Sequence, residues 1–231
     1  MNYAQRRETL ARQLPKNSIA IIANPMPKRR SGDQDYPYRP DSNMIYLTGM
    51  DEAGAVAIIA SSDQDVRFRL FVLKRDLNLE RWTGPRYGVE GAVAKFGADE
   101  AFPIDELDEK LKDIMLPLDE VFFDFSYSQE LASKLFDITE SLRHRGRHSA
   151  EGPRRFADIR DIVGEMRRIK DDDEIEVLKR AAHVSAEGFK NVLAMLKPGV
   201  GEWEVEATLK HTFRVNGAVG ESFGSICAGG A

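Results

Sequence analysis

The stretch S-I-A-I-I-A at residues 18–23 decides the fold class of this chain. It is a short, continuous apolar run rich in isoleucine, which is typical of a strand that helices bury on both faces. Four further runs have strand character: residues 43–48, 54–60, 66–73 and 120–125. Helical apolar spacing appears in four segments: residues 2–14, 89–96, 104–115 and 131–142. Strands and helices alternate, so we predict an α/β domain with a mixed β-sheet flanked by helices.

A second unit is predicted to follow near residue 168. Asp171 and Glu174 have the spacing of a helix N-cap and its third helical position. Lys197-Pro198-Gly199 should end this helix, and a second amphipathic helix is expected over residues 202–216. The final segment, residues 221–231, has the composition of a lone apolar strand running into glycines. Because one strand leaves its backbone groups unpaired, we expect the chain to stop inside an unfinished domain.

The composition limits the partners and the compartment. The 231 residues are 42% hydrophobic and 31% charged, and the net charge of −5 argues against a general nucleic-acid binder. Cys227 is the single cysteine, which excludes an internal disulfide framework. No secretory signal and no apolar run of about 18–20 residues is present. We therefore expect a cytoplasmic protein without a nucleic-acid or membrane partner.

Two loops attract attention because of their polar and aromatic residues. Residues 24–42 should form a long loop, and its centre, R-R-S-G-D-Q-D-Y-P-Y-R at 29–39, combines three arginines with acids and tyrosines. Either these groups pair among themselves on the surface or they bind a ligand. Trp82 precedes a Gly-Pro turn, and an exposed tryptophan often marks an interface or a ligand lid. Residues 143–155 should form a basic loop, followed by a connecting helix over 156–170.

The other reactive residue types favour structural roles. His144 and His148 have i, i+4 spacing, but the neighbouring arginines favour a solvated basic loop over a zinc site. Asp171-Asp172-Asp173 complements the positive end of a helix dipole. Cys227 has no nearby base and is expected to be a small buried apolar residue.

Three motifs resemble aminopeptidase P, the Xaa-Pro aminopeptidase of the creatinase or pita-bread metallopeptidase group. The stretch R-S-G-D-Q-D-Y-P-Y-R-P-D-S-N-M-I-Y-L-T-G at residues 30–49 resembles the family's R-S-x-D-x-x-Y-P-Y-R-x-x-S-x-F-x-Y-x-T-G. The stretch E-R-W-T-G-P-R at 80–86 resembles its W-x-G-x-R element, and 165–182 resembles its interdomain junction. The Y-P-Y-R stretch is the most specific of the three.

The resemblance implies two domains: residues 1–167 as the N-terminal domain, and residues 168–231 as the start of an α+β pita-bread catalytic domain that is truncated here. It also implies removal of an N-terminal residue that precedes proline, by a hydroxide between two divalent metal ions, usually manganese. The family's metal ligands and catalytic residues fall beyond residue 231. We therefore assign no catalytic residue, metal ligand or bound metal to this chain, and we expect it to be inactive alone.

Four positions carry over from the family residue by residue. Asp33 and Trp82 match residues that reach a neighbouring subunit's active site, which implies a homodimer or homotetramer. Arg147 matches an arginine at the active-site entrance, and Phe223 stands where relatives have a tyrosine in the substrate pocket. The alternatives are a fragment of a prolidase or creatinase-like hydrolase, and a non-catalytic assembly module or pseudoenzyme. The unfinished last strand argues against the module.

Overall fold

The computed structural model describes residues 1–60, 67–126, 129–144 and 152–229. These form two compact units, one over Asn2–Arg168 and one over Ile169–Ala231 together with Met1. We call them the N-terminal unit and the C-terminal unit. In the described part of the chain, no helix combines the length and the apolar character that a membrane-spanning segment needs.

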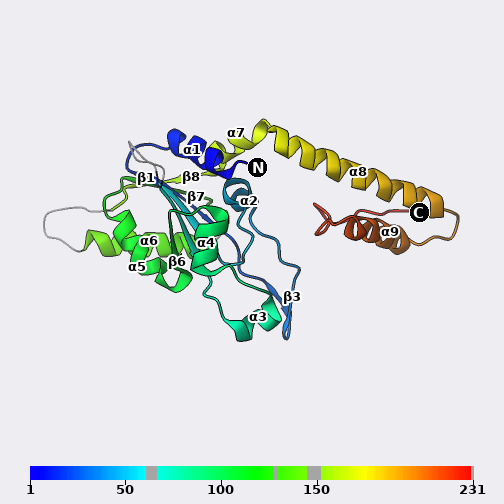
Figure 1. The fold of residues 1–231 in the computed structure, drawn as a ribbon, viewed down its shortest axis with the longest axis horizontal. Coiled ribbons are helices and arrows are strands. Elements are labelled where there is room, and N and C mark those ends of the chain that lie inside the picture. Colours follow the sequence, from blue (N-terminus) through cyan, green and yellow to red (C-terminus); the bar gives the residue numbers. More distant parts are fainter. Residues whose placement is uncertain (61–66, 127–128, 145–151, 230–231) are drawn as a thin grey trace. The chain divides into compact units, whose positions relative to one another are not determined.

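A six-stranded mixed sheet forms the centre of the N-terminal unit (Figure 1). Its strand order is β6-β5-β4-β1-β7-β8. The strands are β1 (Ser18–Ala23), β4 (Val56–Ala60), β5 (Arg67–Val72), β6 (Glu100–Pro103), β7 (Glu120–Phe123) and β8 (Arg155–Asp158). Only β4 runs against its neighbours β1 and β5, whereas the pairs β1–β7, β7–β8 and β5–β6 are parallel. The predicted mixed sheet is confirmed.

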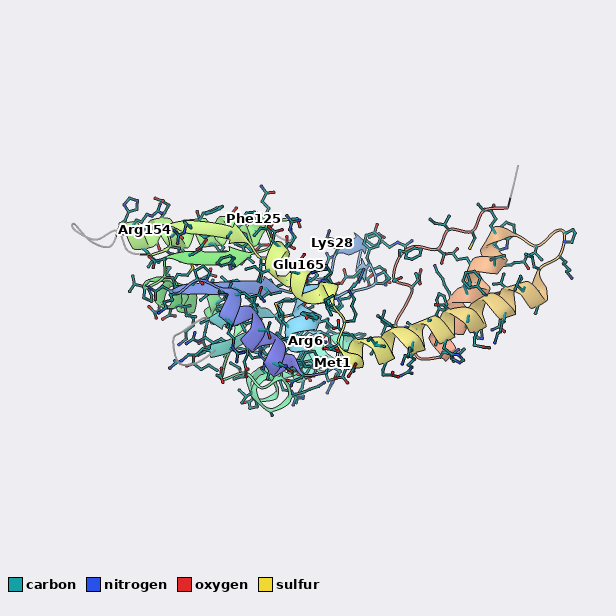
Figure 2. All side chains as sticks on the ribbon, turned by 90° about the horizontal axis from the view of Figure 1, so that it is seen from above. Met1, Arg6, Lys28, Phe125, Arg154 and Glu165 are labelled. Atoms are coloured by element: carbon teal, nitrogen blue, oxygen red, sulfur yellow. The ribbon has the colours of Figure 1, made fainter. Side chains whose placement is uncertain are left out.

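Helices cover both faces of this sheet. The helices of the unit are α1 (Tyr3–Gln13), α2 (Ser42–Thr48), α3 (Leu77–Thr83), α4 (Gly88–Phe96), η1 (Ile104–Glu106), α5 (Leu107–Met115), α6 (Gln129–Arg143) and α7 (Arg160–Arg168). Side chains of β1 alternate between two cores: Ala20 and Ile22 pack with α1, α2, α4 and α7, whereas Ile19 and Ile21 pack with α5 and α6. The helices α1 and α7 lie next to each other; Figure 2 labels Arg6 on α1 and Glu165 on α7.

The predicted strand at residues 43–48 is wrong, because this segment is the helix α2. The Asp41 carboxylate accepts hydrogen bonds from the Asn43 and Met44 amides, 2.8 Å each, and so caps the helix start. Gly49 ends it with φ +73°, a left-handed conformation that suits glycine. The buried residues Met44, Leu47 and Thr48 have helical spacing, but the segment is apolar enough to resemble a strand in sequence.

The segment that precedes the C-terminal unit also differs from the prediction. The sequence predicts a loop over residues 143–155, of which 145–151 lie outside the described residues, and a helix over 156–170. Instead, residues 155–158 form β8, which pairs with β7 at the edge of the sheet, and the helix α7 begins at Arg160. The short motif R-F-A-D carried little strand signal by itself, and the neighbouring strand supplies the hydrogen bonds that define it.

The C-terminal unit contains two packed helices, α8 (Asp172–Met195) and α9 (Glu202–Val215). Asp171 and Glu174 form the predicted capping box at the start of α8. Gly188 lets the helices approach closely: a Cβ there would lie 3.2 Å from Leu209 and 3.3 Å from Phe213. Asn191 also donates a hydrogen bond to Thr212 across the pair.

The strand predicted for residues 221–231 is wrong for the residues that the structure describes, 221–229. This segment is irregular. Its backbone is held by side chains, since the Gly229 amide donates to the Glu202 carboxylate. An extended segment becomes a strand only through a partner, and the described residues of this unit offer none.

Candidate functional site

Two long connections leave the sheet of the N-terminal unit at the same end. The register places the last residue of β1 opposite the first residue of β4, and Val56 of β4 opposite Phe71 near the end of β5. Residues 24–41, which follow β1, and residues 73–87, which follow β5, therefore start from neighbouring points. We call them the hairpin segment and the Trp82 segment.

Asp33 lies at the turn of the hairpin segment. The strands β2 (Arg29–Ser31) and β3 (Gln34–Asp35) pair antiparallel, and Gly32 at the turn has φ +55°. The Tyr36 amide donates a hydrogen bond to the Lys28 carbonyl at 2.9 Å. Lys28 is labelled in Figure 2. The Asp33 side chain is exposed. The predicted loop therefore contains a two-stranded hairpin that presents a carboxylate to solvent.

Asn24 anchors both ends of the hairpin segment. Its side chain is only 4% exposed. Its Nδ2 donates to the carbonyls of Met50 and Glu52, at 3.1 and 2.9 Å, and its Oδ1 accepts from the Asp41 amide at 2.9 Å. Asn24 and Asp41 bound the segment, so one buried amide closes a connection of about eighteen residues.

The Trp82 segment contains the helix α3. Asp76 caps its start by accepting hydrogen bonds from the amides of Asn78 and Leu79. An ion pair between Arg75 and Glu80, 3.1 Å between Nη2 and Oε2, lowers the pKa of the Glu80 carboxyl through its hydrogen bond. Trp82 is 89% exposed. An indole held outward on a capped helix is available to a ligand or to another protein surface.

Glu52 joins the two ends of the Trp82 segment. Its Oε1 accepts from the Leu73 amide at 3.1 Å, and its Oε2 accepts from the Tyr87 amide at 2.9 Å. Its backbone carbonyl is one of the two that Asn24 holds. The two segments are thus tied at their bases by one connected set of hydrogen bonds.

Acidic groups at these bases alter the titration of nearby residues. Burial, followed by the charges of Asp51, Asp41 and Glu52, raises the pKa of Tyr38 to about 12. Burial also raises the pKa of Asp41, although its bonds from the Met44 and Asn43 amides oppose that shift. The Tyr38 hydroxyl therefore keeps its proton at alkaline pH values at which a free tyrosine is ionised.

The C-terminal unit contains an apolar cavity of about 500 Å³. It lies between α8, α9 and the segment after α9, and its lining includes Val184, Phe189, Phe213, Phe223 and Cys227. The Phe223 ring is 74% exposed, so it forms an open wall of this cavity. Cys227 is half-buried, so it is less buried than the sequence predicted.

The structure divides the residues that the sequence singled out. Asp33 and Trp82 lie on the two segments that leave one end of the sheet, whereas Phe223 lies in the C-terminal unit. Arg147, like His148, lies outside the described residues. Asp171 is a helix cap, as expected from the helix-dipole interpretation. Sequence reasoning missed Asn24 and Glu52. Asn24 offered one signal, a polar residue directly after a buried strand, whereas Glu52 lies between α2 and β4 and offered none.

No group of three or more His, Cys, Asp or Glu side chains that would hold a metal ion occurs within residues 1–60, 67–126, 129–144 and 152–229. A divalent metal needs several oxygen or nitrogen ligands that converge on one point. The described residues do not fit such a site, and we assign no chemical step in this chain to a metal.

Comparisons with known proteins identify the family. The model of the aminopeptidase P N-terminal domain matches residues 3–122, just over half of the chain, and the model of metallopeptidase family M24 matches residues 176–231. The Escherichia coli K12 Xaa-Pro aminopeptidase is 32% identical over 99% of this chain, and the match covers 52% of that protein. Human Xaa-Pro aminopeptidase 3 is 26% identical over the full chain and is matched over 47% of its length.

Solved structures agree with the sequence matches. Aminopeptidase PepP from Pseudomonas aeruginosa superposes with a TM-score of 0.89 at 33% identity, covering 94% of this chain and 49% of that one. Proline aminopeptidase P II from Yersinia pestis gives 0.88 at 35% identity, covering 93% and 50%. The chain thus spans about half the length of the relatives it matches. The resemblance seen in the Y-P-Y-R stretch is confirmed, and the chain belongs to the aminopeptidase P family.

Proposed function

We propose that this chain forms part of a metal-dependent Xaa-Pro aminopeptidase, a hydrolase that removes the N-terminal residue preceding proline. The observation that carries the proposal is the position of Asp33 and Trp82 on segments that start at the same end of the sheet. Both match specific family motifs, and both are carried by segments that leave one end of the sheet and are tied together through Asn24 and Glu52. The printed names of the relatives, Xaa-Pro aminopeptidases in bacteria and mammals, support the same reaction.

In this proposal residues 1–167 are the domain that assembles and gates the substrate site, and residues 168–231 contribute to the catalytic domain. Two divalent ions, manganese by family resemblance, activate water in the whole enzyme. The described residues contain no group of three or more His, Cys, Asp or Glu side chains that could hold such an ion, so in this proposal the family's ligands come from another part of the whole enzyme. The 231-residue chain is accordingly expected to be inactive by itself.

The roles of the chain's own residues follow from their chemistry. Trp82 supplies an exposed aromatic face that covers bound peptide, and Asp33 supplies a carboxylate that accepts hydrogen bonds from it. Both act on the site of a neighbouring subunit in a homodimer or homotetramer. Phe223 supplies an apolar wall for the proline ring, and Arg147 stands at the entrance.

The cellular setting is proposed from composition. A single cysteine and a net charge of −5 suit a protein of the reducing cytoplasm that acts on peptides rather than on nucleic acids. A relative that is named as mitochondrial shows that family members also occur elsewhere.

A chimera tests the proposed function. This chain would replace the matching half of the Escherichia coli Xaa-Pro aminopeptidase, and release of the first residue from Xaa-Pro tripeptides would be measured with Mn²⁺ present. Turnover that depends on proline at the second position is expected, with none from the 231-residue chain alone. A folded chimera without turnover, or one that accepts any second residue equally, would contradict the proposal and favour a non-catalytic assembly role.

A further inference from the structure

We propose that Glu52 is a positioning residue, which fixes the segment that carries Trp82 by binding both of its ends. The functional consequence rests on the proposed role of Trp82 at the substrate site. The anchoring itself rests only on geometry.

Each oxygen of the Glu52 carboxylate accepts a hydrogen bond from a different backbone amide, and the two amides lie at opposite ends of the Trp82 segment. Oε1 accepts from Leu73, directly after β5, and Oε2 accepts from Tyr87, directly before α4. Every residue of α3 lies between these two points. A carboxylate has two equivalent acceptor oxygens, whereas a carboxamide has one acceptor oxygen and an NH2 group that only donates. Glutamine therefore cannot satisfy both amides, although it has nearly the same size.

The other polar contacts of this segment do not replace that anchor. The Tyr87 hydroxyl donates to Asp51 at 2.9 Å, but this exposed bond holds only one end of the segment. The Arg75–Glu80 ion pair and the Asp76 cap act within the segment and maintain the shape of α3. Lys74 pairs with Asp105 of η1 at 2.7 Å, but both side chains are more than half exposed, and such pairs contribute little. Glu52 is half-buried and binds backbone, which does not move independently of the segment.

Glu52 is itself held from the sheet. The buried Asn24 side chain donates to the Glu52 carbonyl at 2.9 Å, and the Ala55 amide donates to the same carbonyl at 3.4 Å. The position of the carboxylate is thus set by groups that belong to the core of the unit. The backbone of Glu52 is fixed by the sheet, and its side chain binds both ends of the Trp82 segment. Glu52 therefore restricts the motion of that segment relative to the sheet.

Amide hydrogen exchange on the whole 231-residue chain tests this role. In Glu52→Gln, residues 73–87 are expected to exchange about tenfold faster or more, because a hydrogen bond to a charged group is lost. Exchange in β1 and β4 should remain within about twofold of wild type. Glu109→Gln, the same change on the exposed surface of α5, is the matched control and should leave both regions unchanged.

Trp82 supplies a second measurement. In a Trp203→Phe background it is the only tryptophan, and its fluorescence anisotropy should fall when Glu52→Gln is added. The unmodified chain supplies a third, since its Leu73 and Tyr87 amides should exchange more than tenfold slower than an unstructured peptide. That measurement stands even where the variant fails to fold.

The outcomes separate the anchor from the proposed function. Unchanged exchange in residues 73–87, or equal acceleration throughout the N-terminal unit, would overturn the positioning role of Glu52. Local acceleration in the chain, combined with an active chimera that does not respond to Trp82→Ala, would uphold the anchor and reject the function of Trp82.

Discussion

Asn24→Ala tests whether one buried amide holds the base of the hairpin segment and of the Trp82 segment. The substitution removes three hydrogen bonds from a side chain that is 4% exposed: two donated to the Met50 and Glu52 carbonyls, and one accepted from the Asp41 amide. Each such bond contributes roughly 0.5–1.5 kcal/mol, and the partners that lose it are buried at Met50 and half-buried at Glu52 and Asp41, so we expect a loss of about 3 kcal/mol in the free energy of unfolding.

Urea unfolding followed by far-ultraviolet circular dichroism measures that loss. Asn78→Ala, on the exposed surface of α3, is the matched control and should change the free energy by no more than about 0.5 kcal/mol. A difference between the two variants of less than about 1 kcal/mol would refute the anchoring argument, since it would mean that water or neighbouring groups replace all three bonds.

Asn24→Asp provides an independent check through its pH dependence. It places carboxylate oxygens against two carbonyl oxygens, so the folded state should favour the protonated acid and raise the pKa of the new group. Between the pKa of the new aspartate in the unfolded chain and its raised pKa in the folded state, the folded state binds more protons than the unfolded state. The free energy of unfolding should therefore fall as the pH rises through this range. A stability that rises with pH relative to wild type would contradict the bonding pattern.

Three further changes test other parts of the structure. Between about pH 10, where a free tyrosine ionises, and about pH 12, the folded state retains the Tyr38 proton, so the free energy of unfolding should fall as the pH rises. Ultraviolet titration should show one tyrosine that ionises near pH 12, and this step should be absent in Tyr38→Phe. Arg7→Met removes a bond to the Leu47 carbonyl and a guanidinium 4.0 Å from the Phe68 ring, and should cost about 1–3 kcal/mol in urea unfolding; an unchanged midpoint would show that the buried charge contributes nothing. In the chimera, Phe223→Ala should lower kcat/KM for Xaa-Pro peptides about tenfold while Phe223→Tyr stays within about threefold; equal effects would remove Phe223 from the substrate pocket.

The sequence predicted those parts of the fold in which local pattern and final structure agree. The apolar run of β1, the alternation of β5 and the capping box of α8 each carry their own signal. The strand prediction for residues 43–48 was wrong because their apolar character suits a strand, whereas Asp41 and Gly49 cap the two ends of a helix. The short strand β8 was not predicted because its hydrogen bonds come from β7, a partner distant in sequence.

The candidate site was predictable only where motifs mark it. Asp33 and Trp82 stand in recognisable sequence elements, although their helix and hairpin were not predicted. Asn24 and Glu52 were missed because their importance lies in bonds to the backbone at residues 41, 50, 73 and 87, and a contact over tens of residues leaves no local pattern. The sequence motifs therefore located two exposed side chains, Asp33 and Trp82, but not the groups that hold their segments.

The most direct test of the account is the effect of Trp82→Ala on the chimera with the Escherichia coli catalytic half. Because Trp82 is almost fully exposed and packs little within its unit, its removal should leave the thermal unfolding midpoint unchanged. The account expects kcat/KM for Xaa-Pro tripeptides to fall at least about tenfold, a loss of about 1.4 kcal/mol. Leu77→Ala, which removes another exposed apolar side chain from α3, should have little effect. An unchanged kcat/KM in Trp82→Ala on tripeptides and longer peptides would contradict the claim that this domain gates the substrate site.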